Sequence, residues 1–359
     1  MSEFAIPTEP IGSIPRTQEL VRAQETFREG RISREELHAV ADRATAETIR
    51  GFEETGSPVI SDGEQRKYGG FAFYCLHGAE NLAPDGVEVG FSDGHSRQLP
   101  RLTEGPFRYT ESADGYLETA LKLARTRVKQ AVISPSLLSL IYPADGIEHY
   151  PRERFLADLV REHVGEVRRC LDAGAHKVQI DFTEGRLAVK LDPSGELLRS
   201  FVALLNTSLE SFTYDERNRL GIHTCPGGDW DATHSADVDY LDLLPTLFEI
   251  DVGNFYIAMA SEKEPGRALQ RIGTLIRPGH RVFVGVIDAI DPHVESPEEV
   301  RDRVLEAAEY IPSAQLGTTD DCGFSPFADD LSTSRDLAFA KIRARVEGTR
   351  LAEDALGRG

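Results

Sequence analysis

Residues 221–230 read GIHTCPGGDW, an apolar strand that breaks into a glycine-rich loop. Two soft metal ligands, His223 and Cys225, stand two positions apart at this break. Residues two apart on an extended strand point to the same side, so one metal ion can contact both. A second strand-to-loop stretch, residues 317–326, reads GTTDDCGFSP and supplies Cys322. We therefore expect an open metal site of His223, Cys225 and Cys322 with one position free for a substrate. The alternative is a core histidine with cysteines that are simply buried.

The rest of the chain alternates between short apolar strands and amphipathic helices. The strands are expected at residues 6–16, 58–64, 130–135, 177–181, 219–223, 254–258, 281–288 and 315–320. The helices are expected at residues 18–29, 33–56, 116–127, 151–173, 195–209, 237–248, 267–276, 296–310 and 334–351. Roughly eight strand–helix units favour an α/β fold, a closed (β/α)8 TIM barrel, as a single domain over residues 1–359. A doubly wound open sheet is the alternative.

Residues 66–110 interrupt this alternation after the second strand. They are rich in glycine and aromatic residues, with weak polar–apolar alternation near residues 86–91. We expect an insertion, with a hairpin, that covers one end of the domain, because long loops of this kind are usually functional or oligomeric.

Composition limits the function classes. The 359 residues carry a net charge of -20 without a basic block, which disfavours binding to nucleic acid. No apolar run approaches the ~20 residues of a membrane helix, and residues 1–5 lack an export signal, so we expect a cytoplasmic protein away from membranes. The four cysteines are few and far apart, which favours thiols or metal ligands over disulfides. No dinucleotide or P-loop motif follows a strand.

In a (β/α)8 barrel the chemistry lies at the carboxyl ends of the strands. A histidine with two cysteines suits zinc, Zn2+, and three ligands leave a vacancy that a substrate thiol could fill. Zinc would hold that thiol as a thiolate, a nucleophile for carbon.

Five motifs carry a resemblance to a known family. They are IGSIP at residues 11–15, DGE at 62–64, QID at 179–181, HTC at 223–225 and DCG at 321–323. With them the chain resembles, over almost its whole length, the C-terminal catalytic barrel of the cobalamin-independent methionine synthase superfamily. The resemblance implies zinc-dependent transfer of a carbon group to a thiol. It also implies zinc ligation by His223, Cys225 and Cys322, and a thiol substrate held by Ser13, Glu64 and Asp181.

The chain departs from methionine synthases at three places. Ala258 stands where they carry a further zinc ligand, a glutamate, so a fourth protein ligand is left open. Asp288 lacks the histidine that follows it there, since His293 is out of register. Residues 134–138 read SPSLL and lack the tryptophan near the folate.

Residues 223–230, 254–262 and 284–330 look more similar to the epoxyalkane:coenzyme M transferase branch. That similarity implies a lyase-type reaction in which a zinc-bound thiolate, coenzyme M or a similar thiol, opens an epoxide to give a hydroxyalkyl thioether. The partners would be a small-molecule thiol and a small electrophile, in a homo-oligomer.

Epoxide opening leaves an alkoxide that needs a proton, for which Asp288, His293 and Tyr256 are candidates. The sulfonate of such a thiol needs cations, and these are expected from residues beside strand ends: Arg16, Arg66, Lys67 and Arg186.

Two other functions stay open. One is a methionine synthase-type methyltransferase that methylates homocysteine from 5-methyltetrahydropteroyltriglutamate or another donor. The other is a zinc-stabilised binding protein without catalytic activity.

Overall fold

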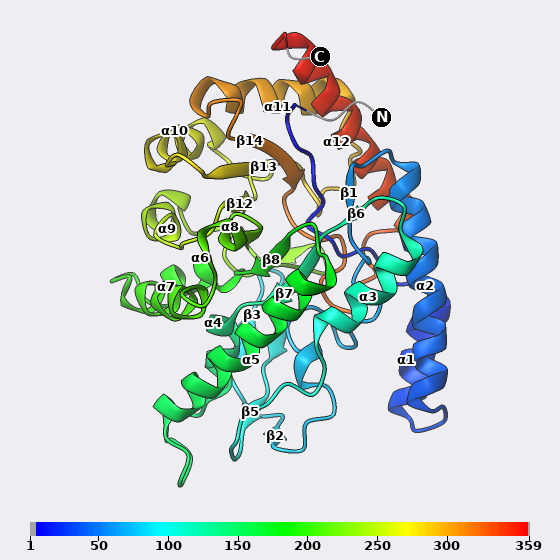
Figure 1. The fold of residues 1–359 in the computed structure, drawn as a ribbon, viewed down its shortest axis with the longest axis vertical. Coiled ribbons are helices and arrows are strands. Elements are labelled where there is room, and N and C mark those ends of the chain that lie inside the picture. The colour runs from blue at the N-terminus through cyan, green and yellow to red at the C-terminus, as the bar shows by residue number, and fades with distance from the viewer. Residues whose placement is uncertain (1–4, 358–359) are drawn as a thin grey trace.

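The computed structural model describes residues 5–357, so most of the segment on which the export-signal expectation rests lies outside the described residues. Six parallel strands form the main sheet in the order β14-β13-β12-β9-β8-β7 (Figure 1). Their bounds are β7 Gln130–Ile133, β8 Val178–Asp181, β9 Leu220–Thr224, β12 Asn254–Ile257, β13 Arg281–Ile287 and β14 Leu316–Asp320. Nearly all residues of these strands are buried, as expected when both faces of a parallel sheet are covered.

Helices surround the strands on the outside (Figure 1). The long ones are α1 Gln18–Arg28, α2 Arg34–Glu54, α3 Ala113–Leu123, α5 Arg152–Ala173, α7 Glu196–Leu209, α10 Pro265–Leu275, α11 Pro297–Tyr310 and α12 Arg335–Ala355. The shorter ones are α4 Pro135–Leu138, α6 Glu184–Leu191, α8 Tyr214–Arg217 and α9 Tyr240–Leu247, with 3-10 turns η1 Tyr74–Leu76 and η2 Ser139–Ile141. The capping boxes of α2 and α11 confirm two helix starts expected from the sequence.

The closed barrel is formed only in part. β1 (Val59–Ile60) pairs with β6 (Arg127–Val128), which leads into β7, and Thr8 bridges Thr318 of β14. The first segment, residues 6–16, was expected to be a strand. Its Ile14 amide donates to the carbonyl of Gly63, in the turn after β1, at 3.1 Å. Within residues 5–357 no continuous ladder joins these edges, so the observed architecture is an α/β fold around a parallel sheet. Residues 7, 10 and 15 are prolines, which cannot donate to a ladder.

Two short helices at the carboxyl ends of β7 and β8 differ from the expected elements. Helix α6 follows β8 directly, where no element was expected. The expected strand at residues 130–135 ends at Ile133, because the Ser134 hydroxyl accepts from the Leu137 amide and starts α4. These two short helices place side chains at the carboxyl ends of β7 and β8.

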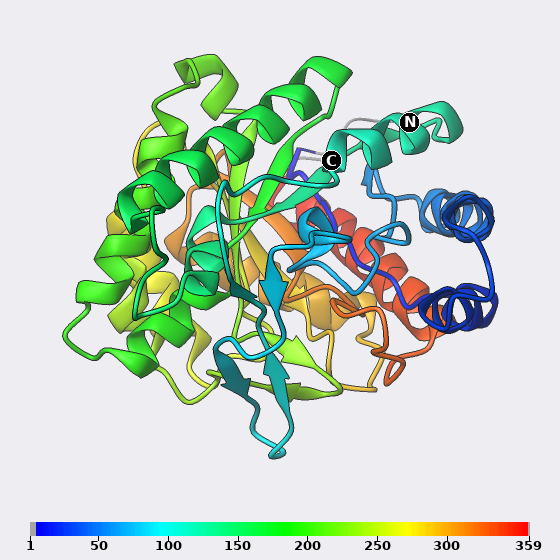
Figure 2. The ribbon, with the colours of Figure 1, turned by 90° about the horizontal axis from the view of Figure 1, so that it is seen from below.

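Residues 66–110 form small two-stranded pieces. β2 (Leu82–Ala83) pairs with β5 (Arg101–Leu102), and β3 (Glu88–Gly90) pairs with β4 (Ser96–Gln98), both antiparallel. Figure 2 shows them projecting at the lower edge of the view, beside the loops that follow the sheet strands. One apolar cluster runs from Ile6 to Ala352 and includes Leu99 and Leu102 of this region. Over the part of the chain that is described, no helix has the length and apolar character to cross a membrane.

Candidate active site

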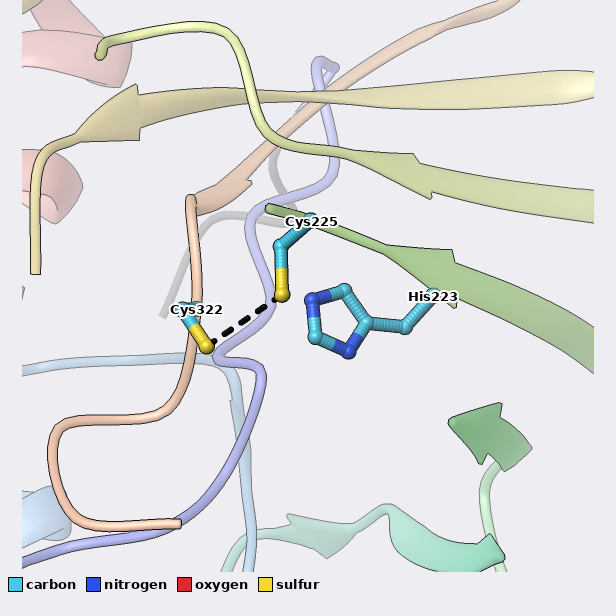
Figure 3. Close-up of side chains that lie close together, drawn as sticks. All are labelled: His223, Cys225 and Cys322. Atoms are coloured by element: carbon cyan, nitrogen blue, oxygen red, sulfur yellow. Dashed lines mark hydrogen bonds between the residues drawn. The ribbon is translucent and has the colours of Figure 1, made fainter. Parts of the chain in front are cut away.

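The three expected metal ligands meet at the carboxyl end of the sheet. His223 comes from β9, Cys225 follows that strand, and Cys322 follows β14. One ligand atom from each residue lies within 4.8 Å of the others, and all three side chains are buried. The two sulfurs are 3.4 Å apart, and Figure 3 shows the imidazole beside them. Strands β9 and β14 are separated in the sheet by β12 and β13, so it is the fold that brings the residues after these two strands together.

Asp181 orients the imidazole. Its Oδ1 lies 3.1 Å from Nδ1 of His223 and also accepts from Gln179 Nε2 at 2.7 Å. Burial would lower the pKa of His223, but the hydrogen bond and charge of Asp181 outweigh burial and raise it. A carboxylate on one ring nitrogen is the usual arrangement behind a metal-ligating histidine. It leaves Nε2 on the side of the sulfurs.

The donor set fits zinc. The hydrogen bond with Cys225 and then burial raise the pKa of the Cys322 thiol well above its usual value, so this thiol resists ionisation. A divalent cation between them would favour both thiolates. The Gly227 amide donates to Cys225 Sγ at 3.4 Å, and Gly227 has a φ of +72° with the His234 ring against its open side. A side chain at Gly227 would disturb this loop.

No carboxylate among the described residues adds a fourth ligand to the cluster. Ala258 lies buried just after β12, where the resemblance implied a glutamate. The nearby Asp321 is occupied: Oδ1 accepts from the amides of Met259 and Ala260, and Oδ2 from the amide and hydroxyl of Ser261. The cluster therefore has one histidine and two cysteines.

A pocket of about 760 Å³, counted with its open mouth, extends from this cluster. Its polar wall includes Ser13, Glu64, Asp181, His223 and Cys322. Its apolar wall comes from several elements, including the insertion: Phe71, Phe73, Val89, Phe91, Leu99, Leu137, Leu187 and Phe327. The pocket is thus lined by two of the metal ligands and by all three residues that the resemblance implied would hold the thiol.

Ser13 and Glu64 are held in place by local contacts. The Ser325 amide donates to Ser13 Oγ at 3.2 Å, which leaves the hydroxyl proton of Ser13 for a ligand. Lys67 Nζ donates to Glu64 Oε1 at 2.9 Å, while Oε2 has no partner in the described structure. Burial raises the pKa of Glu64 although Lys67 lowers it.

The four cations expected to bind a sulfonate all have partners within the protein. Arg16 donates to the Ser325 and Glu64 carbonyls, and Lys67 pairs with Glu64. Arg66 pairs with Asp42, and Arg186 Nη1 donates to Glu262 at 3.1 Å. None of the four is among the residues found to line the pocket.

The three expected proton donors also lie away from the pocket wall described above. The buried Tyr256 hydroxyl donates to Glu9 Oε2 at 2.6 Å. His293 is mostly exposed and pairs with Glu299 at 3.1 Å. Asp288 accepts from the amide of Ile290 in its own loop. None of the three belongs to the described pocket wall, and their role as proton donors stays a prediction.

Glu184 lines the pocket and was missed by sequence reasoning. It is the first residue of α6, and its signal was weak, since acidic residues are common in the first turn of a helix and are mostly exposed. The helical spacing of Leu187, Ala188 and Leu191 after an acceptable start at Thr183 could have predicted α6 itself.

Residues 6–337 match the family described as "Cobalamin-independent synthase, Catalytic domain", and the chain belongs to this enzyme family. The methionine synthase of Sulfurisphaera tokodaii is 24% identical, over 99% of this chain and 95% of that protein. The uncharacterized protein YxjH of Bacillus subtilis is 22% identical, over 94% of this chain and 92% of that one.

A solved structure shares the fold. The B12-independent methionine synthase from Shewanella sp. W3-18-1, in complex with selenomethionine, superposes with a TM-score of 0.78 at 19% identity and covers 98% of both chains. These comparisons confirm the superfamily resemblance. They do not show the narrower resemblance to epoxyalkane:coenzyme M transferases.

Proposed function

We propose that the protein is a zinc-dependent thiol methyltransferase of the methionine synthase type, acting on an aminothiol such as homocysteine. The observation that carries the proposal is the cluster of His223, Cys225 and Cys322 within 4.8 Å beside a pocket. Zinc bound there would hold a substrate thiol as the thiolate. The three protein ligands leave room for that sulfur.

The charges in the pocket favour an amine over a sulfonate. Three carboxyl side chains line it, those of Glu64, Asp181 and Glu184. In the described structure its wall holds a single arginine or lysine, Arg97, which pairs with Asp229 and Asp329. The carboxylate of Asp181, in a described wall without an unpaired cation, attracts an ammonium and repels a sulfonate. The expected epoxide opening by a coenzyme M-like thiol therefore lacks its anion-binding cations, and homocysteine methylation becomes the better reading.

Substrate positioning follows from the same residues. Glu64 Oε2 is free for the ammonium, and Ser13 can donate its hydroxyl to the substrate carboxylate. Asp181 keeps the His223 ring oriented. As part of the same proposal, the eight strand segments form a (β/α)8 barrel whose carboxyl rim carries the site. Chain association as a homo-oligomer stays a prediction.

The test combines metal content with thiol binding. We expect about one zinc per chain, and a spectral shift of the cobalt-substituted protein when homocysteine is added but not when coenzyme M is added. Cys322→Ser should lose metal and methionine formation while its circular dichroism is retained. Cys170→Ser, a matched change at a buried cysteine of α5, should lose neither. Coenzyme M binding with turnover of an epoxide would contradict the proposal, and unfolding of Cys322→Ser would instead indicate a structural zinc.

A further inference from the structure

Glu184 is a buried carboxyl with one oxygen in use and one oxygen without a partner. Ser134 Oγ and Ser136 Oγ both donate to Oε1, each at 2.5 Å. Oε2 is shielded from solvent and has no hydrogen-bond partner among residues 5–357. The side chain is 1% exposed and lines the same pocket as His223 and Cys322. A buried oxygen without a partner is costly, so this arrangement points to a ligand that completes it.

The environment lets this carboxyl hold a proton up to about pH 7. Burial raises the pKa of Glu184 to about 7, although the hydrogen bonds from the two serine hydroxyls lower it. The charge of Asp181 adds to the increase. The other titratable groups of the described pocket wall are Glu64, Arg97, His223, His234 and Cys322. Burial lowers the pKa of His234 to about 4. The cations on α6 do not reach Glu184, because Arg186 pairs with Glu262 and Lys190 with Asp237.

We propose that Glu184 is a catalytic residue, the general acid that protonates the leaving atom of the methyl donor through Oε2. This inference rests on the proposed function. It also fills a gap, since Asp288, His293 and Tyr256 are absent from the described pocket wall. Glu64, the other carboxyl of that wall with an unpartnered oxygen, is ion-paired with Lys67, whereas Glu184 has no cationic partner.

The step balances with the donor and the thiolate alone. The thiolate sulfur forms a bond to the methyl carbon, and the bond from that carbon to the leaving atom breaks with its electron pair on the leaving atom. The proton of Glu184 moves to that atom, and Glu184 regains a proton from solvent after product release. Such help matters for a neutral N-methyl amine, whose leaving nitrogen would otherwise depart as an anion. A methyl sulfonium departs as a neutral sulfide and needs no proton.

The kinetic test compares two donors in Glu184→Gln, which keeps the shape and the acceptor for Ser134 and Ser136. With homocysteine, transfer from a neutral N-methyl donor such as 5-methyltetrahydropteroyltriglutamate should slow about 100-fold or more. Transfer from the sulfonium S-methylmethionine should change by less than about threefold, as a general acid is not required there. Equal losses with both donors, or no loss with either, would overturn the role of Glu184.

A matched control and a readout without turnover separate the outcomes. Glu166 of α5 is equally buried, has a pKa raised to about 7 and is absent from the pocket wall as described. Infrared difference spectra should show a protonated carboxyl band that responds to the N-methyl donor in wild type and Glu166→Gln but not in Glu184→Gln. A responding band in Glu184→Gln would refute the assignment. If wild type methylates homocysteine from neither donor, the proposed function fails and this inference fails with it. If wild type is active and only the donor dependence is missing, the inference alone fails.

Discussion

Asp181 shows how much one residue can decide at this site. It holds Nδ1 of His223, faces the pocket and accepts from Gln179. These contacts fix the direction of the imidazole before any metal binds. Loss of a positioning carboxylate of this kind typically lowers metal affinity or activity.

Asp181→Asn should therefore lower zinc affinity by about 10- to 100-fold, because the amide no longer strengthens the ring as a ligand. Competition with a chromophoric chelator measures the affinity. Asp62→Asn is the control, since Asp62 is also buried but belongs neither to the described pocket wall nor to the cluster. Equal zinc affinities of wild type and Asp181→Asn would refute the positioning role.

Glu166 makes the pH dependence of stability testable at one residue. Burial raises the pKa of Glu166 to about 7, although the Ala113 amide and the Tyr74 hydroxyl donate to it. A raised carboxyl pKa means that the folded state binds more protons than the unfolded state between about pH 4.5 and 7, so stability falls as pH rises through this window. Glu166→Gln removes this loss.

Relative to wild type, we expect Glu166→Gln to gain on the order of 2 kcal/mol in free energy of unfolding between pH 5 and pH 8. Urea unfolding at both values measures the gain. Glu35→Gln, on the exposed side of the first turn of α2, should give no such trend. A pH-independent difference between Glu166→Gln and wild type would show that Glu166 ionises normally.

At the scale of elements, the β3–β4 hairpin depends on one arginine. Arg97 of β4 donates to Asp229, which follows Cys225 in the chain, and to Asp329, which follows Cys322. Its guanidinium also lies over the rings of Trp230 and Phe327, at 4.8 and 4.4 Å from their centroids. The hairpin is therefore tied to both loops that carry cysteine ligands, and Val89, Phe91 and Leu99 become pocket wall.

Arg97→Ala should release the hairpin, because it removes both ion pairs and leaves the buried Asp229 with the His95 ring as its remaining side-chain partner. Hydrogen exchange of amides in residues 86–99 should accelerate at least about tenfold. That acceleration corresponds to a decrease of about 1.4 kcal/mol in the free energy of local opening. Arg101→Ala removes an exposed pair with Asp85 in the same insertion and should leave the exchange of residues 88–98 nearly unchanged. Unaltered exchange in Arg97→Ala would refute the tie.

At the scale of the whole molecule, Glu9 helps to close the sheet where the ladder is incomplete. Its carboxylate accepts from Lys177 Nζ at 2.6 Å and from the Tyr256 hydroxyl, and its carbonyl accepts from Arg345. Burial alone would raise the pKa of Glu9, but Lys177, His176 and Lys129 lower it well below its usual range. A lowered carboxyl pKa stabilises the fold above about pH 4.5, and this contribution is lost as pH falls.

Glu9→Ala should destabilise the protein by about 3–5 kcal/mol at pH 7, because it leaves Lys177 buried without its carboxylate. Denaturant unfolding measures the loss. The control, Glu19→Ala, breaks an exposed pair with Arg43 and should cost less than about 1 kcal/mol. A loss of that small size in Glu9→Ala would mean that the first segment is held by packing alone.

The order of strands and helices could be predicted because the periodicity of apolar residues is a local property. The spacing of His223 and Cys225 is local too, since residues two apart on a strand share a face. Cys322 could be placed near them only by assuming that strand ends meet at one rim, and the structure brings it there.

Partner choice, in contrast, depended on the tertiary structure. Arg16, Arg66, Lys67 and Arg186 stand beside strand ends in the sequence, but Asp42, Glu64 and Glu262 pair with them or share their contacts. Glu184 carries no pattern of its own, and its burial comes from the packing of α6 against the turn at Ser134 and Ser136. Hydrophobic period acts over a few residues, whereas charge pairing and burial are set by segments that meet only after folding. The order of strands and helices could therefore be predicted from the sequence. Which partner each charged side chain has could not, because it depends on the folded structure.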